Sequence, residues 1–178
     1  MPASDRPAFQ PISFIPIAHV RSPYATRIDA PHQATVVEGT ESGDLAEARI
    51  EFIDFIPAEA FRDLAGFDRV WLVFVFDRSE GWKTEVKPPR GGPKRSVLAT
   101  RSPHRPNSIG LSAVELVAVE DRALRVRGID LLDGTPILDV KPYVPYADAF
   151  PDARAGWIDA LDAKQGKHSA PGPRKPRR

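Results

Sequence analysis

Apolar and polar residues alternate with period two along much of the chain. Between residues 46 and 52, apolar side chains alternate with charged ones, which predicts a half-buried β-strand. The run RVWLVFVF at 69–76 is almost entirely apolar and predicts a strand that is covered on both faces. Similar patterns predict further strands at 14–20, 96–100, 111–119, 123–129 and 136–140.

Helical patterns are sparse. Phe61 and Leu64 would lie on one helix face, Pro57 precedes them and Gly66 follows, which indicates a short helix with a proline start and a glycine stop. Apolar spacing predicts a second short helix near 157–161. Helices therefore do not alternate with strands.

The order of these elements argues for a β-barrel. A doubly wound nucleotide-binding fold needs repeated βαβ units and a glycine-rich turn, and neither GxGxxG nor GxxxxGK[ST] occurs. Closure would remove the exposed edges of so many strands. We therefore expect a mostly β protein, a single-sheet closed or nearly closed barrel of about seven to nine strands with one or two short helices. The barrel domain is expected at 13–163, after a flexible N-terminus at 1–12 and before a disordered basic tail at 164–178.

Composition narrows the functional classes. The 178 residues are 42% apolar and 28% charged, with no cysteine, which suits one soluble domain and excludes disulfide scaffolds, thiolate metal sites and cysteine nucleophiles. The longest apolar run, 70–76, is much shorter than the roughly 20 residues that cross a bilayer, and no signal-peptide pattern is present. A cytoplasmic protein is the expectation.

Templates for metal binding and covalent hydrolysis are missing. The serine motif GxSxG does not occur. No metal site is expected, because the histidines are too far apart for short ligand spacings; they are His19, His32, His104 and His168.

Positive charge is concentrated in two segments. Residues 84–110 carry six Lys or Arg against one acid, together with five prolines and three glycines. Cations on such stiff loops suit a phosphate-rich or carboxylate ligand, although a solvated surface loop is the alternative. The last fifteen residues, 164–178, hold six Lys or Arg and no acid. That tail would attract nucleic-acid phosphates or be merely solvated.

Two further segments interrupt the strand pattern. One is RSPYATRIDAPHQ at 21–33. The other, DLLDGTPILDVKPYVPY at 130–146, places acidic residues and Lys141 around a Gly-Thr-Pro turn. Backbone groups in such a turn are expected to be free to meet a ligand, and an ordinary hairpin with capping aspartates is the alternative.

Long, ordered strings identify a resemblance. GFDRVWLVFVF, ATRSPHRPNSIGLSAVEL and GIDLLDGTPILDVKPYVPY, with RSPY and PHQ upstream, resemble the TsaA-like (YaeB, TrmO-type) family over about residues 14–157. The resemblance implies a single-sheet barrel that forms a homodimer and binds S-adenosylmethionine. It also implies methylation of N6 of threonylcarbamoyl-adenosine beside the tRNA anticodon.

The resemblance also implies a cofactor site. Arg101 is expected to hold the cofactor's carboxylate bidentately, and Leu111 to pack against an apolar face. Where the family commonly has Pro-Arg-Gln and a frequent His-Gln, this chain has Pro-His-Gln at 31–33 and Asp-Arg at 77–78. The implied cofactor residues are Pro31, His32, Gln33, Asp77, Arg78, Arg101, Leu111, Asp133, Gly134, Thr135 and Pro136.

The reaction sets further requirements. Methyl transfer from a sulfonium is an in-line displacement that needs alignment of the reactants, and removal of the acceptor's proton would assist it. The candidate bases are Asp139, Asp133 and Tyr143. Residues expected to position the RNA are Arg21, Arg90, Lys94, Arg95, Arg105 and Asn107.

Two other functions remain open at this stage. One is methylation of a different small acceptor. The other is a non-catalytic module that binds RNA or a nucleotide, for which failure to bind S-adenosylmethionine would be the distinguishing property.

Overall fold

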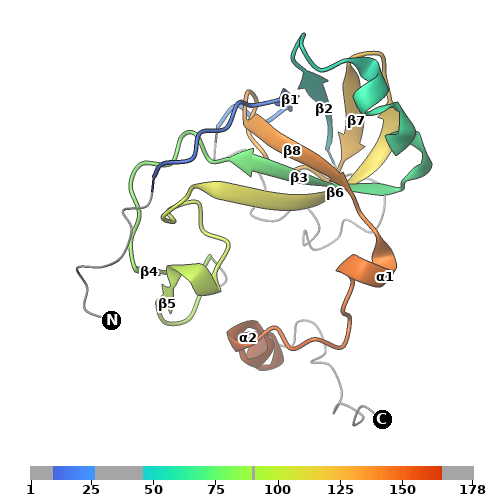
Figure 1. Ribbon diagram of the computed structural model, residues 1–178. Helices are drawn as coiled ribbons and strands as arrows, with labels where there is room; N and C mark the ends of the chain where they lie inside the picture. Colours follow the sequence, from blue (N-terminus) through green and yellow to red (C-terminus); the bar gives the residue numbers. More distant parts are fainter. Residues whose placement is uncertain (1–9, 27–45, 90, 166–178) are drawn as a thin grey trace.

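The computed structural model describes residues 10–26, 46–89 and 91–165. Its body is a closed antiparallel barrel with the strand order β1-β2-β7-β6-β3-β8 (Figure 1), in which β8 pairs with β1 to close the ring. The barrel strands are β1 (Ala18–Arg21), β2 (Glu47–Phe52), β3 (Arg69–Val75), β6 (Ile109–Val119), β7 (Ala123–Arg127) and β8 (Pro136–Pro142).

The fold class expected from the sequence is confirmed, but the barrel has six strands rather than seven to nine. The difference lies at 96–100, where the expected strand ends after Ser96 and the chain continues as a 3-10 turn. The remaining elements are β4 (Glu85–Val86), which pairs with β5 (Arg95–Ser96), the 3-10 helices η2 (Ala58–Ala60), η3 (Arg62–Gly66) and η4 (Val97–Ala99), and the helices α1 (Pro145–Asp148) and α2 (Trp157–Gln165). The helix expected after Pro57 is thus two 3-10 turns.

The period-two pattern places alternate side chains inside the barrel. Ile50, Leu72, Leu124 and Ile137 are completely buried there. Phe61, from the segment between β2 and β3, stacks on Phe52 with 4.2 Å between ring centroids. This stack contributes to the core at one end of the barrel.

Strand β3 alternates in burial, contrary to the expectation of cover on both faces. Val70, Leu72 and Phe74 are buried, whereas Trp71 and Val73, which face outward, are only half-buried. The apolar run therefore presents its second face to the outside of the barrel.

Antiparallel pairing determines where the connections meet. Strands β1, β3 and β7 run toward one end of the barrel, and β2, β6 and β8 run away from it. The segments that follow β1, β3 and β7 therefore begin at the same end, which we call the mouth. In the described parts of the chain, no helix is long and apolar enough to cross a membrane.

Candidate functional site

The mouth gathers most of the residues that the sequence singled out. The connection after β3 contains the Asp77-Arg78 pair and the basic stretch, and the connection from β7 to β8 contains the Asp-Gly-Thr-Pro turn. Arg21 ends β1 at the same place. Three segments that are far apart in sequence thus share one end of the barrel.

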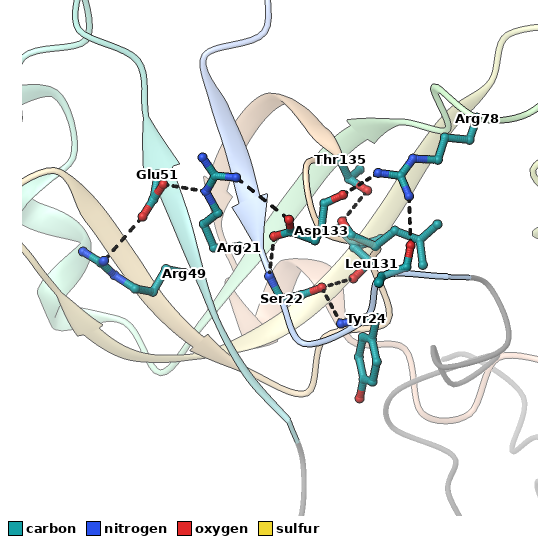
Figure 2. A network of polar contacts seen from close by, with 11 residues as sticks. Arg21, Ser22, Tyr24, Arg49, Glu51, Arg78, Leu131, Asp133 and Thr135 are labelled. Atoms are coloured by element: carbon teal, nitrogen blue, oxygen red, sulfur yellow. Dashed lines mark hydrogen bonds and ion pairs between the residues drawn. The ribbon is translucent and has the colours of Figure 1, made fainter.

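Arg78, on the segment after β3, joins that segment to the other two. Its guanidinium donates a hydrogen bond of 2.7 Å to the backbone carbonyl of Asp133 and one of 3.2 Å to the carbonyl of Ala25. Figure 2 shows the side chain of Arg78 reaching toward the loop that contains Leu131 and Asp133. Arg78 thus positions the loops around the mouth.

The Asp133 carboxylate faces the end of β1 (Figure 2). Its Oδ1 accepts a hydrogen bond from the Ser22 amide at 3.2 Å, and its Oδ2 lies 3.9 Å from Arg21. Arg21 is bound more closely to Glu51, at 2.9 Å. The hydrogen bond and charge of Glu51, followed by the charge of Asp133, raise the pKa of Arg21. The two carboxylates therefore restrain this exposed guanidinium.

The structure of the Gly-Thr-Pro turn contradicts two interpretations of the sequence, an ordinary hairpin and free backbone groups. It is not a hairpin, because β7 pairs with β2 and β6, while β8 pairs with β1 and β3. Its backbone donors are not free either, since the amides of Asp133, Gly134 and Thr135 donate to the carbonyls of Tyr24, Val20 and Leu132. Gly134 has φ +81°, which glycine adopts without the steric cost other residues bear. Tertiary hydrogen bonds thus occupy groups that the sequence leaves available.

Asp130 is a site residue whose surroundings only the structure reveals. The hydroxyl of Ser112, on β6, donates to its Oδ1 at 3.0 Å. Burial raises the pKa of the Asp130 carboxyl, while the Ser112 hydrogen bond, a backbone hydrogen bond and the charge of Arg101 act in the opposite direction. A carboxyl near a cation at the mouth is a candidate for ligand binding.

The segment 100–108 is folded onto itself. Arg105 donates to the Thr100 carbonyl at 3.3 Å, and the Ser102 hydroxyl accepts from the His104 amide at 3.3 Å. Ser79, after β3, lies 3.1 Å from Nδ1 of His104. Sequence reasoning did not select Ser79 or His104 as site residues. Arg101 and Asn107 are exposed on this segment.

The β4–β5 sheet is joined to α2. The Arg95 guanidinium lies over the Trp157 ring, 5.2 Å from its centroid, and the Trp157 indole donates to the Ala99 carbonyl at 2.9 Å. Among the residues that the structure describes, the buried Nε of Arg95 has no hydrogen-bond partner. Lys94 is exposed beside it. Arg95 therefore has a packing contact that the sequence did not indicate, and Lys94 faces solvent.

Three predicted residues are not on the mouth loops, and only one of them, Leu111, lies close to the mouth. Asp139 forms an ion pair with Lys141 at 2.7 Å in the middle of β8. Tyr143 packs against Trp71 and binds the backbone of Arg69 at the opposite end of the barrel. Leu111 lies near the mouth and is 49% exposed on the outside of β6.

Other predictions lie outside the described residues. They concern Pro31, His32, Gln33, Arg90, residues 1–9 of the expected N-terminal segment and residues 166–178 of the basic tail. Within the described ranges, no group of three or more His, Cys, Asp or Glu side chains is arranged to hold a metal ion.

Comparison with known proteins gives a consistent result. Residues 19–149 match the family model described as tRNA-methyltransferase O N-terminal domain. The tRNA (adenine(37)-N6)-methyltransferase of Escherichia coli is 37% identical over 85% of this chain and 66% of its own length. The "Probable S-adenosyl-L-methionine-binding protein" of Pyrococcus abyssi is 38% identical over 83% of this chain and 77% of its own length.

A solved structure agrees in fold. The crystal structure of TrmO from Pseudomonas aeruginosa has a TM-score of 0.69 and 38% identity, covering 84% of this chain and 64% of that one. This chain thus spans less than two thirds of the length of the two bacterial proteins.

Proposed function

Because the chain belongs to the tRNA-methyltransferase O N-terminal domain family, we propose that it binds S-adenosylmethionine and methylates N6 of threonylcarbamoyl-adenosine beside the tRNA anticodon. The observation that carries this proposal is the assembly of Arg78, Arg101, Asp130 and Asp133 around the mouth from separate segments. The names of an Escherichia coli relative and a Pyrococcus abyssi relative support the same reaction and cofactor.

The chemistry of the mouth fits this cofactor. S-adenosylmethionine supplies an electrophilic methyl group on a sulfonium and carries a carboxylate and an ammonium. The exposed guanidinium of Arg101 is suited to hold that carboxylate, and the exposed side chain of Leu111 offers an apolar contact nearby. Arg78 fixes the loops around this pair, so that few groups need to be ordered on binding.

Asp133 is the base candidate that we propose. Of the three carboxyl and phenol candidates, Asp133 is the one on a mouth loop, whereas Asp139 is paired with Lys141 and Tyr143 packs at the opposite end. The Ser22 amide orients the Asp133 carboxylate. From this position the carboxylate would accept the proton that the acceptor nitrogen loses during transfer.

The described basic residues support an RNA partner. Lys87 and Lys94 are exposed on the connection between β3 and β6, so they are available to anticodon-loop phosphates without first breaking a packing contact. Each such contact would release counterions and make the affinity dependent on salt. Arg21, Arg105 and Asn107 remain proposed contributors at the mouth.

A homodimer is part of the proposal. Residues paired across the outside of β3 and β6 are apolar on both strands, namely Trp71 with Ala113, Val73 with Leu111 and Val75 with Ile109. The outer side of β2 and β7 instead carries ion pairs such as Arg127 with Glu47 at 2.8 Å. We propose that the apolar face, defined as these six β3 and β6 residues, packs against a second copy. Leu111 would then lie at the boundary between the two protomers.

The decisive experiment is titration of the purified protein with S-adenosylmethionine, followed by methyl transfer to tRNA with and without the threonylcarbamoyl group. We expect binding, and transfer only to the modified tRNA. Arg101→Ala should abolish binding, while the control Arg122→Ala, in the turn at the opposite end of the barrel, should not. Binding without transfer would indicate another acceptor, and no binding would favour a non-catalytic RNA-binding module.

A further inference from the structure

The three tryptophans differ in what their indole rings contact. The indole N–H of Trp71 donates to the Asp148 carboxylate at 3.1 Å, and that of Trp157 donates to the Ala99 carbonyl at 2.9 Å. These two rings also pack against a tyrosine and an arginine, respectively. Trp82 is 53% exposed, and among the described residues its ring makes neither a hydrogen bond nor a contact of this kind. Its indole face is therefore open to a ligand.

The segment that carries Trp82 is the positive part of an otherwise negative domain. Residues 76–108, which join β3 to β6, contain eight Lys or Arg and three Asp or Glu, a formal charge of +5. The remainder of residues 1–163 contains eleven Lys or Arg and 21 Asp or Glu, a formal charge of −10. A polyanion is therefore attracted to the connection that carries Trp82 and repelled by the rest of the domain.

The chain on either side of Trp82 is anchored. Before it, the hydroxyl of Ser79 donates to the Pro103 carbonyl at 3.1 Å. After it, the Thr84 carbonyl accepts a hydrogen bond of 2.9 Å from the first backbone amide of η4. Trp82 thus stands on a short loop between two fixed points, which lowers the entropy that a ligand must overcome to order the ring.

Lysine side chains accompany the open ring. Lys83 follows Trp82 directly and is exposed. Lys87 and Lys94 are also exposed and flank the last paired residues of the β4–β5 sheet, which is separate from the barrel sheet (Figure 1). Proteins that bind single-stranded nucleic acids combine aromatic rings, on which bases stack, with cations that hold the phosphates. Bases in a duplex stack on one another, so this combination selects unpaired nucleotides.

Resting on the proposed tRNA substrate, we propose that Trp82 stacks on one unpaired base of the anticodon loop, while Lys83 holds a neighbouring phosphate. This assignment gives the connection between β3 and β6 an RNA-binding surface outside the cofactor site. The lysines then supply attraction to any RNA, and Trp82 supplies the preference for a loop over a duplex.

The test measures binding of the full chain to two probes, a synthetic anticodon stem-loop and a fully paired RNA duplex, at several salt concentrations. Trp82→Ala should weaken stem-loop binding about tenfold and leave duplex binding unchanged. Its slope of log affinity against log salt should equal that of the wild type, because stacking releases no counterions. Lys83→Ala should instead reduce the slope for the stem-loop by about one.

Two further variants control for the loss of a large side chain. Trp82→Phe retains an aromatic face and should recover part of the stem-loop affinity. Phe55→Ala removes a ring that is 61% exposed in the segment after β2, at the opposite end of the barrel, and should change neither affinity.

Tryptophan fluorescence provides a second measurement. A base stacked on the indole should quench its emission, so the stem-loop should quench the wild type more than Trp82→Phe, and the duplex should quench both equally. Emission of the wild type without RNA should not depend on protein concentration. If it does so and Trp82→Phe does not, a second copy of the chain covers Trp82, which would overturn the assignment.

The binding outcomes separate this assignment from the proposed function. Unchanged stem-loop affinity of Trp82→Ala, or equal weakening of the stem-loop and the duplex, would overturn the stacking contact while leaving the tRNA substrate in place. Failure of the wild type to bind either RNA would overturn the tRNA substrate and this assignment with it.

Discussion

The guanidinium of Arg78 donates a 2.7 Å hydrogen bond to the backbone carbonyl of Asp133, 55 positions further along the chain. A second hydrogen bond reaches the carbonyl of Ala25. One side chain thus ties the loop after β3 to the loops after β1 and β7. The resemblance implies that Arg78 binds the cofactor directly. These hydrogen bonds show that Arg78 also positions the loops of the mouth.

Arg78→Ala is expected to loosen both loops and to weaken cofactor binding. Loss of two hydrogen bonds from a charged donor to exposed loops should lower the free energy of unfolding by roughly 1 kcal/mol. Hydrogen exchange should become faster in 22–26 and 131–135, with the barrel strands unchanged. Arg78→Lys should restore only part of the protection, because an ammonium lacks the forked donor geometry. Unchanged exchange in both loops would contradict the positioning role.

Gly110→Ala is expected to destabilise the barrel. A methyl group on Gly110 would overlap the ring of Phe74, which lies opposite it across the β3–β6 pair. Overpacking of this kind costs about 1–3 kcal/mol. The matched control is Gly66→Ala, because no atom of the described residues lies within 4 Å of the position that a Cβ on Gly66 would take. Chemical denaturation of both variants measures the difference, and equal stability of the two would refute the steric argument.

The free energy of unfolding of Asp130→Asn is expected to increase relative to that of the wild type as pH rises. Burial raises the pKa of Asp130 above its ordinary value of 3.8, so the folded protein holds this proton when the unfolded chain has lost it. Stability then falls as pH rises from 3.8 through the raised pKa. Asparagine cannot ionise and avoids this loss.

Thermal unfolding of both proteins between acidic and neutral pH tests this prediction. The difference in melting temperature should shift in favour of the variant across that window and become constant on either side. A difference that does not vary with pH would show that ionisation of Asp130 carries no cost in the fold.

Replacing Lys94 and replacing the adjacent Arg95 by alanine are expected to have different effects. Lys94→Ala should weaken tRNA binding and reduce the slope of log affinity against log salt by about one, because Lys94 is exposed. Arg95→Ala should instead weaken the packing of α2 against the β4–β5 sheet, because the Arg95 guanidinium packs over the Trp157 ring. Filter binding at several salt concentrations measures the first effect, and hydrogen exchange in α2 measures the second. Identical behaviour of the two variants would contradict this division.

Ile109→Lys is expected to shift the proposed dimer toward monomer. Ile109 is 41% exposed at the end of the apolar face, and a charge buried between two copies would be unfavourable. Sedimentation at several protein concentrations measures the change. Leu98→Lys is the control, since Leu98 is 71% exposed and lies outside the barrel. A wild type that remains monomeric at every concentration would refute the dimer.

Local sequence patterns were sufficient to predict where several strands lie. Alternation at 46–52 and the apolar run at 69–76 predicted β2 and β3 closely, because the side-chain period of a strand is visible within a few residues. The strand predicted at 96–100 was wrong, because a short strand and a 3-10 turn have similar apolar content. Its position beside α2 depends on Trp157, which is far away in sequence.

The sequence by itself determined that this chain is a β-barrel of the TsaA-like type and which strings carry its chemistry, since strand periodicity and motif order are local properties. Only the tertiary structure decided which groups remain available to a ligand. The amides of the Gly-Thr-Pro turn donate to carbonyls of β1 and of neighbouring loops, and the Asp130 carboxylate accepts a hydrogen bond from Ser112 on β6. The physical reason is that burial and hydrogen bonding depend on pairing between distant strands, which no short stretch of sequence records.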